Sequence, residues 1–198
     1  MSAGRVDHPL RQFAELSMQY GHGWLAVLLV LAAGAYSTLF LPWFMGQNES
    51  FLVGKPLPDT LLWYSPAQLF SLAESYGEAG RAQYIFGAFT FDFVFPLVYG
   101  AALVVLAGWL ARPYRHANLR QAYLLFAFPI LTIASDFLEN ASVSAVMAVS
   151  PEHPIVLAWV AVIATPLKWL AFTISGLVLV SVFILRVANA LAKAFRPA

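Results

Sequence analysis

The sequence predicts an all-α integral membrane protein, an antiparallel four-helix transmembrane bundle with a short interfacial helix in the first outer loop. Of its 198 residues, 61% are hydrophobic and 11% are charged, whereas soluble domains have roughly 45 to 50% apolar and about 25% charged residues. Four apolar stretches exceed the roughly 20 residues that cross about 30 Å of hydrocarbon. They cover about residues 22–45, 82–111, 119–149 and 155–186, all within one polytopic domain, residues 1–198.

The uneven placement of basic residues predicts how the chain is oriented. They precede the first stretch, surround the second connection and follow the fourth stretch: Arg5, Arg11, Arg112, Arg115, Arg120, Arg186, Lys193 and Arg196. The other two connections carry mostly acidic residues. Because Lys and Arg collect on the cytoplasmic side, we expect both termini and residues 112–118 in the cytoplasm. The short chain and this bias favour a bacterial inner membrane.

The outer loop, residues 46–81, contains a helix signal. Ser65 and Gln68 have the spacing of a capping box, Pro66 occupies the first helical position, and Gly77 offers a stop. Between them lies one apolar stripe of Leu69, Leu72, Ala73 and Tyr76. This pattern predicts a helix of about eleven residues on the outer membrane surface. Because it leads directly into the second span, a lid over a cavity is the alternative.

Residues 9–20 form a second candidate surface helix, on the cytoplasmic side. One side of it would carry Leu10, Phe13, Ala14 and Ser17, the arrangement of an amphipathic helix lying in the membrane interface. An unstructured tail is the alternative. The two interpretations differ in whether this face is covered.

Charged residues interrupt three of the apolar stretches. Asp92 lies in the second stretch, Asp136 and Glu139 in the third, and Lys168 in the fourth. A charge at the bilayer centre costs at least about 2.5 to 3.5 kcal/mol, so such residues usually face the bundle interior. At about 1.5 Å of rise per residue, all four lie roughly 15 to 20 Å from the predicted outer ends. Their common depth predicts one shared site.

Helical spacing supports the same site. In the third stretch Thr132, Asp136, Asn140 and Ser144 recur every four residues and form one polar stripe. The second stretch offers Tyr84, Asp92 and Tyr99 on one side, and the fourth offers Thr165 and Lys168. We take Asp92, Asp136, Glu139 and Lys168 as candidate catalytic residues. The candidate ligand-binding residues are Tyr84, Tyr99, Asn140 and Thr165.

The charges of this site do not balance. Three carboxylates against one ammonium leave an excess of two negative charges, which low-dielectric surroundings resist. Either carboxyl groups are protonated, or a bound cation, metal or cationic substrate completes the balance. Asp136 and Glu139 have a spacing that could hold a hard cation, but Lys168 would oppose a metal. We therefore expect no metal.

No cofactor is expected either. The chain has no cysteine, which excludes iron–sulfur clusters and covalently attached haem within it. Its histidines are His8, His22, His116 and His153, and all lie in tails, connections or helix ends. Multi-histidine iron sites and buried bis-histidine haem therefore lack ligands.

Three functions are open to this sequence. The first is a pocket for a lipid-like or isoprenoid-like molecule; if it is catalytic, which the sequence leaves uncertain, acid/base chemistry is the class that these residues support. The second is a proton- or ion-coupled transporter, and the third is a structural or accessory membrane subunit whose buried charges only fix helix packing. Expected partners are the lipid bilayer, a hydrophobic small molecule and a homo-oligomer or larger membrane complex, with no nucleic acid.

Overall fold

The computed structural model describes residues 9–40, 42–43, 54–114 and 119–195. The regular elements are all helical: α1 (Pro9–Tyr20), α2 (Gly23–Ala35), α4 (Pro66–Phe89), α5 (Phe91–Ala111), α6 (Leu119–Val149) and α7 (Ile155–Ala194), with a π-helical turn η1 (Tyr36–Phe40) and two 3₁₀ turns, η2 (Pro58–Thr60) and η3 (Arg112–Tyr114). No strand occurs in the described part of the chain. The predicted all-α class is confirmed.

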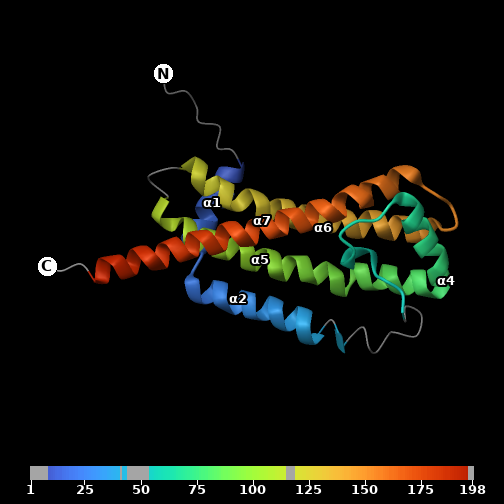
Figure 1. The fold of residues 1–198 in the computed structure, drawn as a ribbon, viewed down its shortest axis with the longest axis horizontal. Helices are drawn as coiled ribbons and strands as arrows, with labels where there is room; N and C mark the ends of the chain where they lie inside the picture. Colours follow the sequence, from blue (N-terminus) through green and yellow to red (C-terminus); the bar gives the residue numbers. More distant parts are fainter. Residues whose placement is uncertain (1–8, 41, 44–53, 115–118, 196–198) are drawn as a thin grey trace, which may run out of the picture.

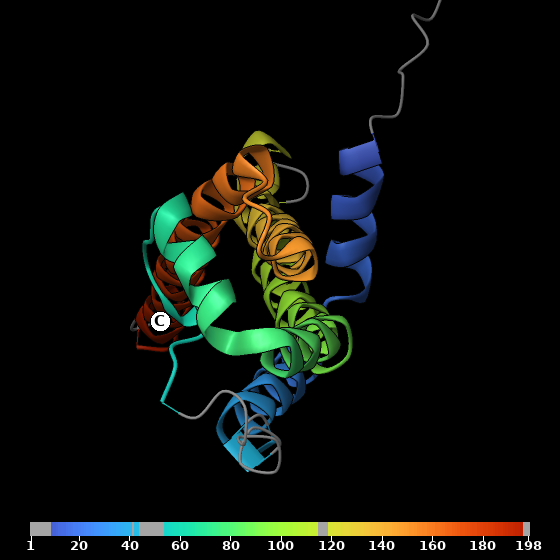
Figure 2. The ribbon, with the colours of Figure 1, turned by 90° about the vertical axis from the view of Figure 1, so that its right-hand side faces the viewer.

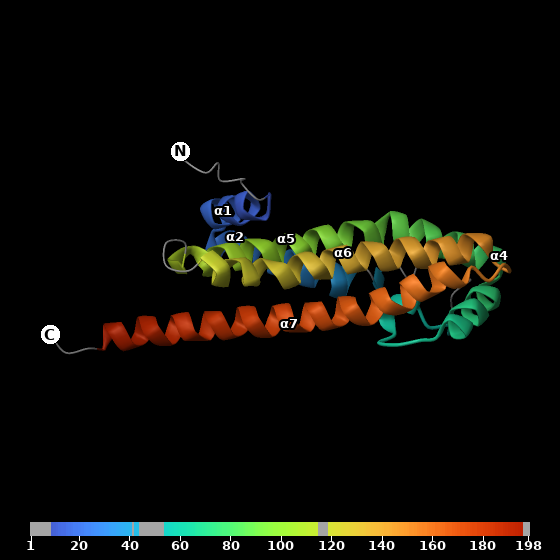
Figure 3. The same ribbon diagram turned by 90° about the horizontal axis from the view of Figure 1, so that it is seen from above.

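The long helices lie side by side along the longest axis (Figures 1 and 3). α6 contacts α5 and α7 along its length, and α2 packs against α5. At one end α4 turns across the helices, as Figure 2 shows from that side. At the other end α1 lies against α5 and α6. α6 therefore occupies the centre of the molecule.

Three helical stretches are long and apolar enough to cross a membrane. Among the described residues these are Gly23–Phe40, Pro66–Ala111, which includes α4 and α5, and Ile155–Ala194. In α6, the predicted third span, a run of polar side chains interrupts the apolar sequence. Those polar residues are all buried: Thr132, Ser135, Asp136, Glu139, Asn140, Ser142 and Ser144.

Exposed apolar side chains support a membrane protein. On α2, Trp24, Leu28 and Leu31 are more than half exposed. On the second half of α7, Leu177 and Leu185 are exposed to a similar extent. Helices that are apolar all round suit hydrocarbon surroundings or the inside of a larger protein. The polar face of α6 and the apolar faces of α2 and α7 thus divide the molecule into a polar interior and an apolar surface.

The predicted second span, residues 82–111, is two helices rather than one. The helix is interrupted at Thr90 (φ −117°, ψ −78°), between the end of α4 and the start of α5. α4 itself is bent at Gly77, whose φ of 68° and ψ of 176° are not helical. Tyr84 and Asp92, predicted on one helix, therefore lie on different helices. Helix α7 continues beyond residue 186, where the predicted fourth span ends, to Ala194.

The predicted outer-loop helix begins and ends where its signals lie. Ser65 N donates to Gln68 Oε1 (2.7 Å), and Gln68 N donates to Ser65 Oγ (3.2 Å), which completes the capping box. Gly77 ends its regular geometry. Its apolar stripe is covered by α6 and α7, in a cluster that includes Leu69, Ala73, Tyr76, Val143, Val146, Ala158 and Val162. The stripe thus packs on protein.

The opposite end carries the basic residues. Ala14 and Met18 of α1 are buried against the end of α5, so residues 9–20 are a covered helix and not an unstructured tail. Arg112 Nε donates to Met18 O (2.7 Å), and Arg186 Nη1 donates to Trp109 O (2.9 Å). Arg5, Arg115 and Arg196, which also support the predicted orientation, lie outside the described residues.

Replacing Gly77 should destabilise the fold. Its φ of 68° with ψ of 176° belongs to a region that is essentially restricted to glycine, so Gly77→Ala should lower the free energy of unfolding by about 1 to 3 kcal/mol. Gly87→Ala is the matched control, because Gly87 is helical in α4 and an added Cβ meets nothing within 4 Å. That variant should be neutral or stabilising by up to about 1 kcal/mol. Thermal unfolding in a neutral detergent measures both; equal effects would contradict this account.

Candidate functional site

Three of the predicted charged residues meet between α6 and α7. Lys168 Nζ lies 2.5 Å from Glu139 Oε2 and 3.7 Å from Asp136 Oδ1. Asp136 and Glu139 are three residues apart, so they share one face of α6 and reach the same ammonium group. Glu139 is 0% exposed and Lys168 is 8% exposed. Removal of one partner from such a buried pair typically costs about 3 to 5 kcal/mol.

A chain of hydrogen bonds continues from both ends of this ion pair. Thr165 Oγ1 donates to Glu139 Oε1 (2.6 Å) and lies 2.9 Å from the hydroxyl of Tyr64. Because the threonine hydroxyl has one hydrogen, Tyr64 is the donor to Thr165 when Thr165 donates to Glu139. On the other side Tyr99 donates to Asp136 Oδ2 (2.6 Å). The polar chain therefore extends from Tyr64, just before α4, to Tyr99 of α5.

A cavity of about 440 Å³ opens beside Asp136 and Lys168. We call it the acidic cavity. Segments α2, η1, η2, α5, α6 and α7 supply its walls, and its volume is within the roughly 300 to 1,000 Å³ typical of small-molecule sites. Its polar lining consists of Ser37, Asp59, Thr60, Asp92, Thr132, Asp136 and Lys168, and its aromatic lining of Phe95, Tyr99, Trp169 and Phe172. The lining thus combines acidic and aromatic side chains.

Helix α2 and the π-helical turn η1 that follows it border the acidic cavity. Gly34 and Ser37 line the cavity, and Thr38 Oγ1 donates to Gly34 O (2.7 Å). Tyr36 anchors this turn, because its hydroxyl donates to Phe91 O (2.6 Å) and its ring stacks on Phe95 at 5.5 Å. π-Helical turns occur frequently at functional sites. Here the turn borders the cavity.

Asp59 is a cavity residue that the sequence patterns did not identify. It lies in η2, is half-buried, and its carbonyl oxygen accepts from Trp169 Nε1 at 3.3 Å. Burial raises the pKa of the Asp59 carboxyl above its ordinary value, Asp136 adds to the rise, and Lys168 opposes it. An acid between Pro58 and Thr60, in an otherwise mostly apolar segment, was the signal available in the sequence.

Asp59 makes the charge imbalance larger than the sequence suggested. The site contains four carboxyl groups, those of Asp59, Asp92, Asp136 and Glu139, and one ammonium, that of Lys168. Full ionisation would leave three uncompensated negative charges. Asp92 lies in the first turn of α5, where the helix dipole favours a carboxylate. Protons or a bound cation must supply the remaining compensation.

The other predicted residues take different places. Thr165 lies behind the ion pair, in the hydrogen-bonded chain. Asn140 is 4% exposed and lies beside the Asp92 carboxyl, at a geometry that leaves both of its amide atoms without a hydrogen bond. Tyr84 is buried in α4, where its ring lies 6.1 Å from that of Tyr76, and it is not part of the cavity lining. Its predicted place beside Asp92 is lost at the break between α4 and α5.

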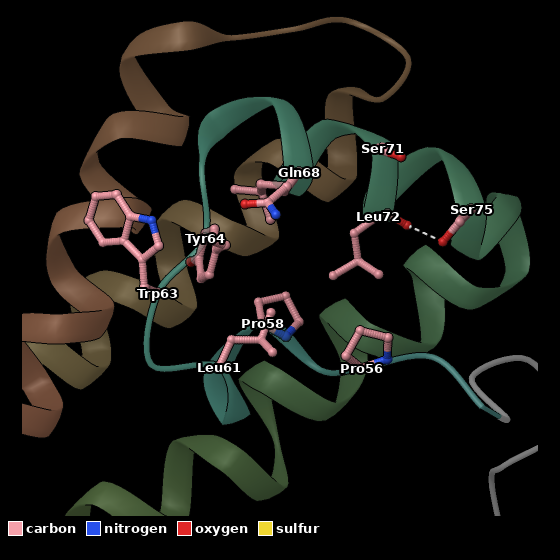
Figure 4. A pocket seen from close by; sticks show the side chains of 10 residues that line it. Pro56, Pro58, Leu61, Trp63, Tyr64, Gln68, Ser71, Leu72 and Ser75 are labelled. Atoms are coloured by element: carbon pink, nitrogen blue, oxygen red, sulfur yellow. Dashed lines mark hydrogen bonds between the residues drawn. The ribbon is translucent and has the colours of Figure 1, made fainter.

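A second cavity lies between residues 56–64 and α4. Figure 4 shows this cavity, which has a volume of about 380 Å³. Its lining is largely apolar and includes Pro56, Pro58, Leu61 and Leu72. The segment 56–64 therefore separates the two cavities, with Asp59 and Thr60 facing one and its prolines the other. We call this segment the strap.

The arrangement has the elements of binding and of proton transfer. Carboxyl groups and tyrosine hydroxyls within hydrogen-bond distance can exchange protons, and a largely apolar cavity can hold an uncharged hydrocarbon group. Among the described residues, no three His, Asp or Glu side chains form a group that could hold a metal ion. Comparisons with models of protein families, with curated proteins and with solved structures find no match to this chain.

Thr165 should contribute through its hydroxyl group. Thr165 is 0% exposed, so Thr165→Val would leave Glu139 Oε1 and the Tyr64 hydroxyl without this partner at nearly constant volume. We expect a loss of about 1 to 3 kcal/mol in the free energy of unfolding. Thr165→Ser is the control, because it keeps the hydroxyl. Unfolding in mixed micelles compares the two; a greater loss in the serine variant would indicate that packing, and not the hydrogen bond, matters.

Asp59 should make stability depend on pH. A carboxyl whose pKa is raised by folding contributes most below its ordinary pKa of about 3.9, and that contribution is lost as the pH rises through the raised pKa. Asp59→Asn lacks this contribution at every pH. The variant should therefore gain stability relative to the wild type as the pH rises from about 4.

The measurement is the midpoint of thermal unfolding in neutral detergent at a series of pH values. Asp92, Asp136 and Lys168 surround Asp59 and stay in place in both proteins, so the difference between the two curves isolates Asp59. Thr60→Ser, in the same turn, should run parallel to the wild type. An Asp59→Asn variant that loses stability relative to the wild type as the pH rises would contradict the raised pKa.

Proposed function

We propose that the protein crosses a bacterial inner membrane four times, as an antiparallel bundle of α2, α4–α5, α6 and α7. In this arrangement α6 is a span in spite of its polar residues, because its neighbours cover them. Arg112 and Arg186 lie at one end of the helices, which supports a cytoplasmic location for that end and both termini. Glu74 and His153 form a contact at the other end.

The location of the outer end has further support. Leu62 and Trp63 of the strap are 69% and 64% exposed, and tryptophan favours the membrane interface. Residues 66–76 lie next to them in the chain and pack on α6 and α7. We place this helix at the outer interface, where it covers the end of the bundle and combines both predicted roles.

We propose further that the acidic cavity binds a lipid-like or isoprenoid-like molecule. The observation that carries this proposal is the cavity of about 440 Å³, whose lining combines aromatic side chains with Asp136 and Lys168. A hydrocarbon group would contact Phe95, Trp169 and Phe172. A polar group of the same molecule would reach the carboxyl groups.

Acid/base chemistry on the bound molecule is compatible with this geometry. Lys168 stabilises negative charge on Glu139, at 2.5 Å. Asp92 and Asp136 line the cavity with less compensation, so one protonated acid could donate while an ionised partner accepts. The hydroxyl of Tyr99, which donates to Asp136, would orient that carboxylate.

Transport has less support in this structure. A pathway across the bundle would continue from the acidic cavity towards the end where α1 lies. That end is filled by apolar side chains of a buried cluster, including Met18, Leu110, Leu125, Phe126 and Leu179. In this conformation the cavity is thus accessible from one side, which favours binding over passage.

Bound mass should be detectable in the purified protein. We expect native mass spectrometry of gently solubilised wild type to reveal an adduct of defined mass, and Asp136→Asn to lose it. Glu78→Gln, which changes an exposed acid of α4, is the matched control and should keep the adduct.

The outcome also separates the structural alternative. If the charges only fix helix packing, Asp136→Asn should unfold or lose a partner subunit, and no specific adduct should appear in any sample. A folded Asp136→Asn with the same adduct as the wild type would contradict the proposed site.

A further inference from the structure

The acidic cavity has a chemistry that selects the charge of its ligand. We propose that it binds an organic cation, an ammonium group attached to an apolar chain or ring. This inference rests on the proposed function and specifies that the ligand carries a positive charge. Three observations carry it: the uncompensated acids, the aromatic side chains of the lining and a buried amide beside one of the acids.

The acids of the lining exceed its positive charge. Lys168 is the one basic residue among the described residues that line the cavity, and its ammonium is closest to Glu139, at 2.5 Å. Asp136 is farther from it, at 3.7 Å. Asp59 and Asp92 have no ion pair within 4.0 Å among the described residues. A ligand with one positive charge would reduce this excess, whereas an anion would increase it.

The aromatic side chains of the lining suit an ammonium group. The rings of Phe95 and Tyr99 lie 5.1 Å apart, those of Tyr99 and Phe172 5.9 Å, and those of Phe172 and Trp169 6.4 Å. The four rings thus form a chain of edge-to-face contacts, and Lys168 Nζ lies 5.4 Å from the centroid of the Trp169 ring. Aromatic faces attract cations, and such cages bind quaternary ammonium ligands. The rings also solvate the carbon substituents of the cation.

Asn140 adds a buried polar group beside these acids. It is 4% exposed, and neither amide atom makes a hydrogen bond of full geometry, although buried polar groups are almost always paired. It lies beside Asp92, which lines the cavity. A cation drawn to Asp92 would fix that carboxylate where Asn140 could donate to it. An organic ammonium fits better than a metal ion, because the described acids are not grouped as metal ligands.

The test compares two probes of one shape. Benzyltrimethylammonium and neopentylbenzene differ in a single atom, a charged nitrogen in place of carbon. Their dissociation constants are measured for the full chain in neutral maltoside detergent, corrected for uptake by protein-free micelles. We expect the cation to bind at least about tenfold more tightly. Phenylacetate, the anionic probe, should not bind.

Variants place the binding in the cavity. Asp59→Asn and Asp92→Asn should each weaken binding of the cation roughly tenfold or more and leave the neutral probe unchanged. Gly34→Leu should abolish binding of both probes, because Gly34 lines the cavity and a Cβ there meets nothing within 4 Å. Glu78→Gln should change neither. If Asp92→Asn does not fold, the Asp59→Asn variant, which changes the strap, still tests whether an acid of the cavity binds the cation.

Two results would overturn the inference, and they differ in what they say of the proposed function. In the first, both probes bind equally well, fail to bind to Gly34→Leu, and have unchanged dissociation constants for the Asp variants. In that case the cavity binds ligands without selecting a cation. If no probe binds and no adduct accompanies the purified protein, the inference and the proposed function both fail.

Discussion

The polar face of α6 is the constraint on which the rest of the structure depends. Seven polar or charged residues of this helix are buried, from Thr132 to Ser144, and a single charge left in hydrocarbon would cost at least about 2.5 to 3.5 kcal/mol. Other helices therefore have to surround it. α5 and α7 cover its length, and α4 covers the end nearest the strap. α2, which is apolar all round, packs on α5 and can remain exposed to lipid.

The ion pair of Lys168 and Glu139 joins this packing to the strap. It holds α6 against α7, and through Thr165 it reaches Tyr64, which is buried at the end of the strap. On the other side Asp136 reaches Tyr99 of α5. Three helices, α5, α6 and α7, and the strap thus share one polar network. A change of charge in the cavity would alter the contacts of the strap, because one hydrogen-bonded network connects the cavity with Tyr64.

Much of this site could be predicted from the sequence. Charged residues in apolar stretches have to face the protein interior, and helical spacing then determines which of them share a face. Spacing along α6 placed Asp136 and Glu139 together, and depth brought Lys168 to them. Asp59 could not be found that way, since depth and periodicity apply to helices and it lies in a loop. Tyr84 was grouped with Asp92 on the assumption of a continuous helix, which the break at Thr90 ends. The capping box and Gly77 gave the limits of the loop helix, but not the surface that it covers.

The excess of acid implies a link between ligand and proton. Asp59, Asp92, Asp136 and Glu139 cannot all be ionised beside one ammonium in low-dielectric surroundings without a large electrostatic penalty. Without a bound cation, protons must therefore occupy part of this set. A cation that enters would take over their role and favour the ionised carboxylates, so binding of the cation and release of a proton are coupled. The apolar cluster around Leu110 and Leu179 closes the other end, so the exchange would take place on the side of the strap.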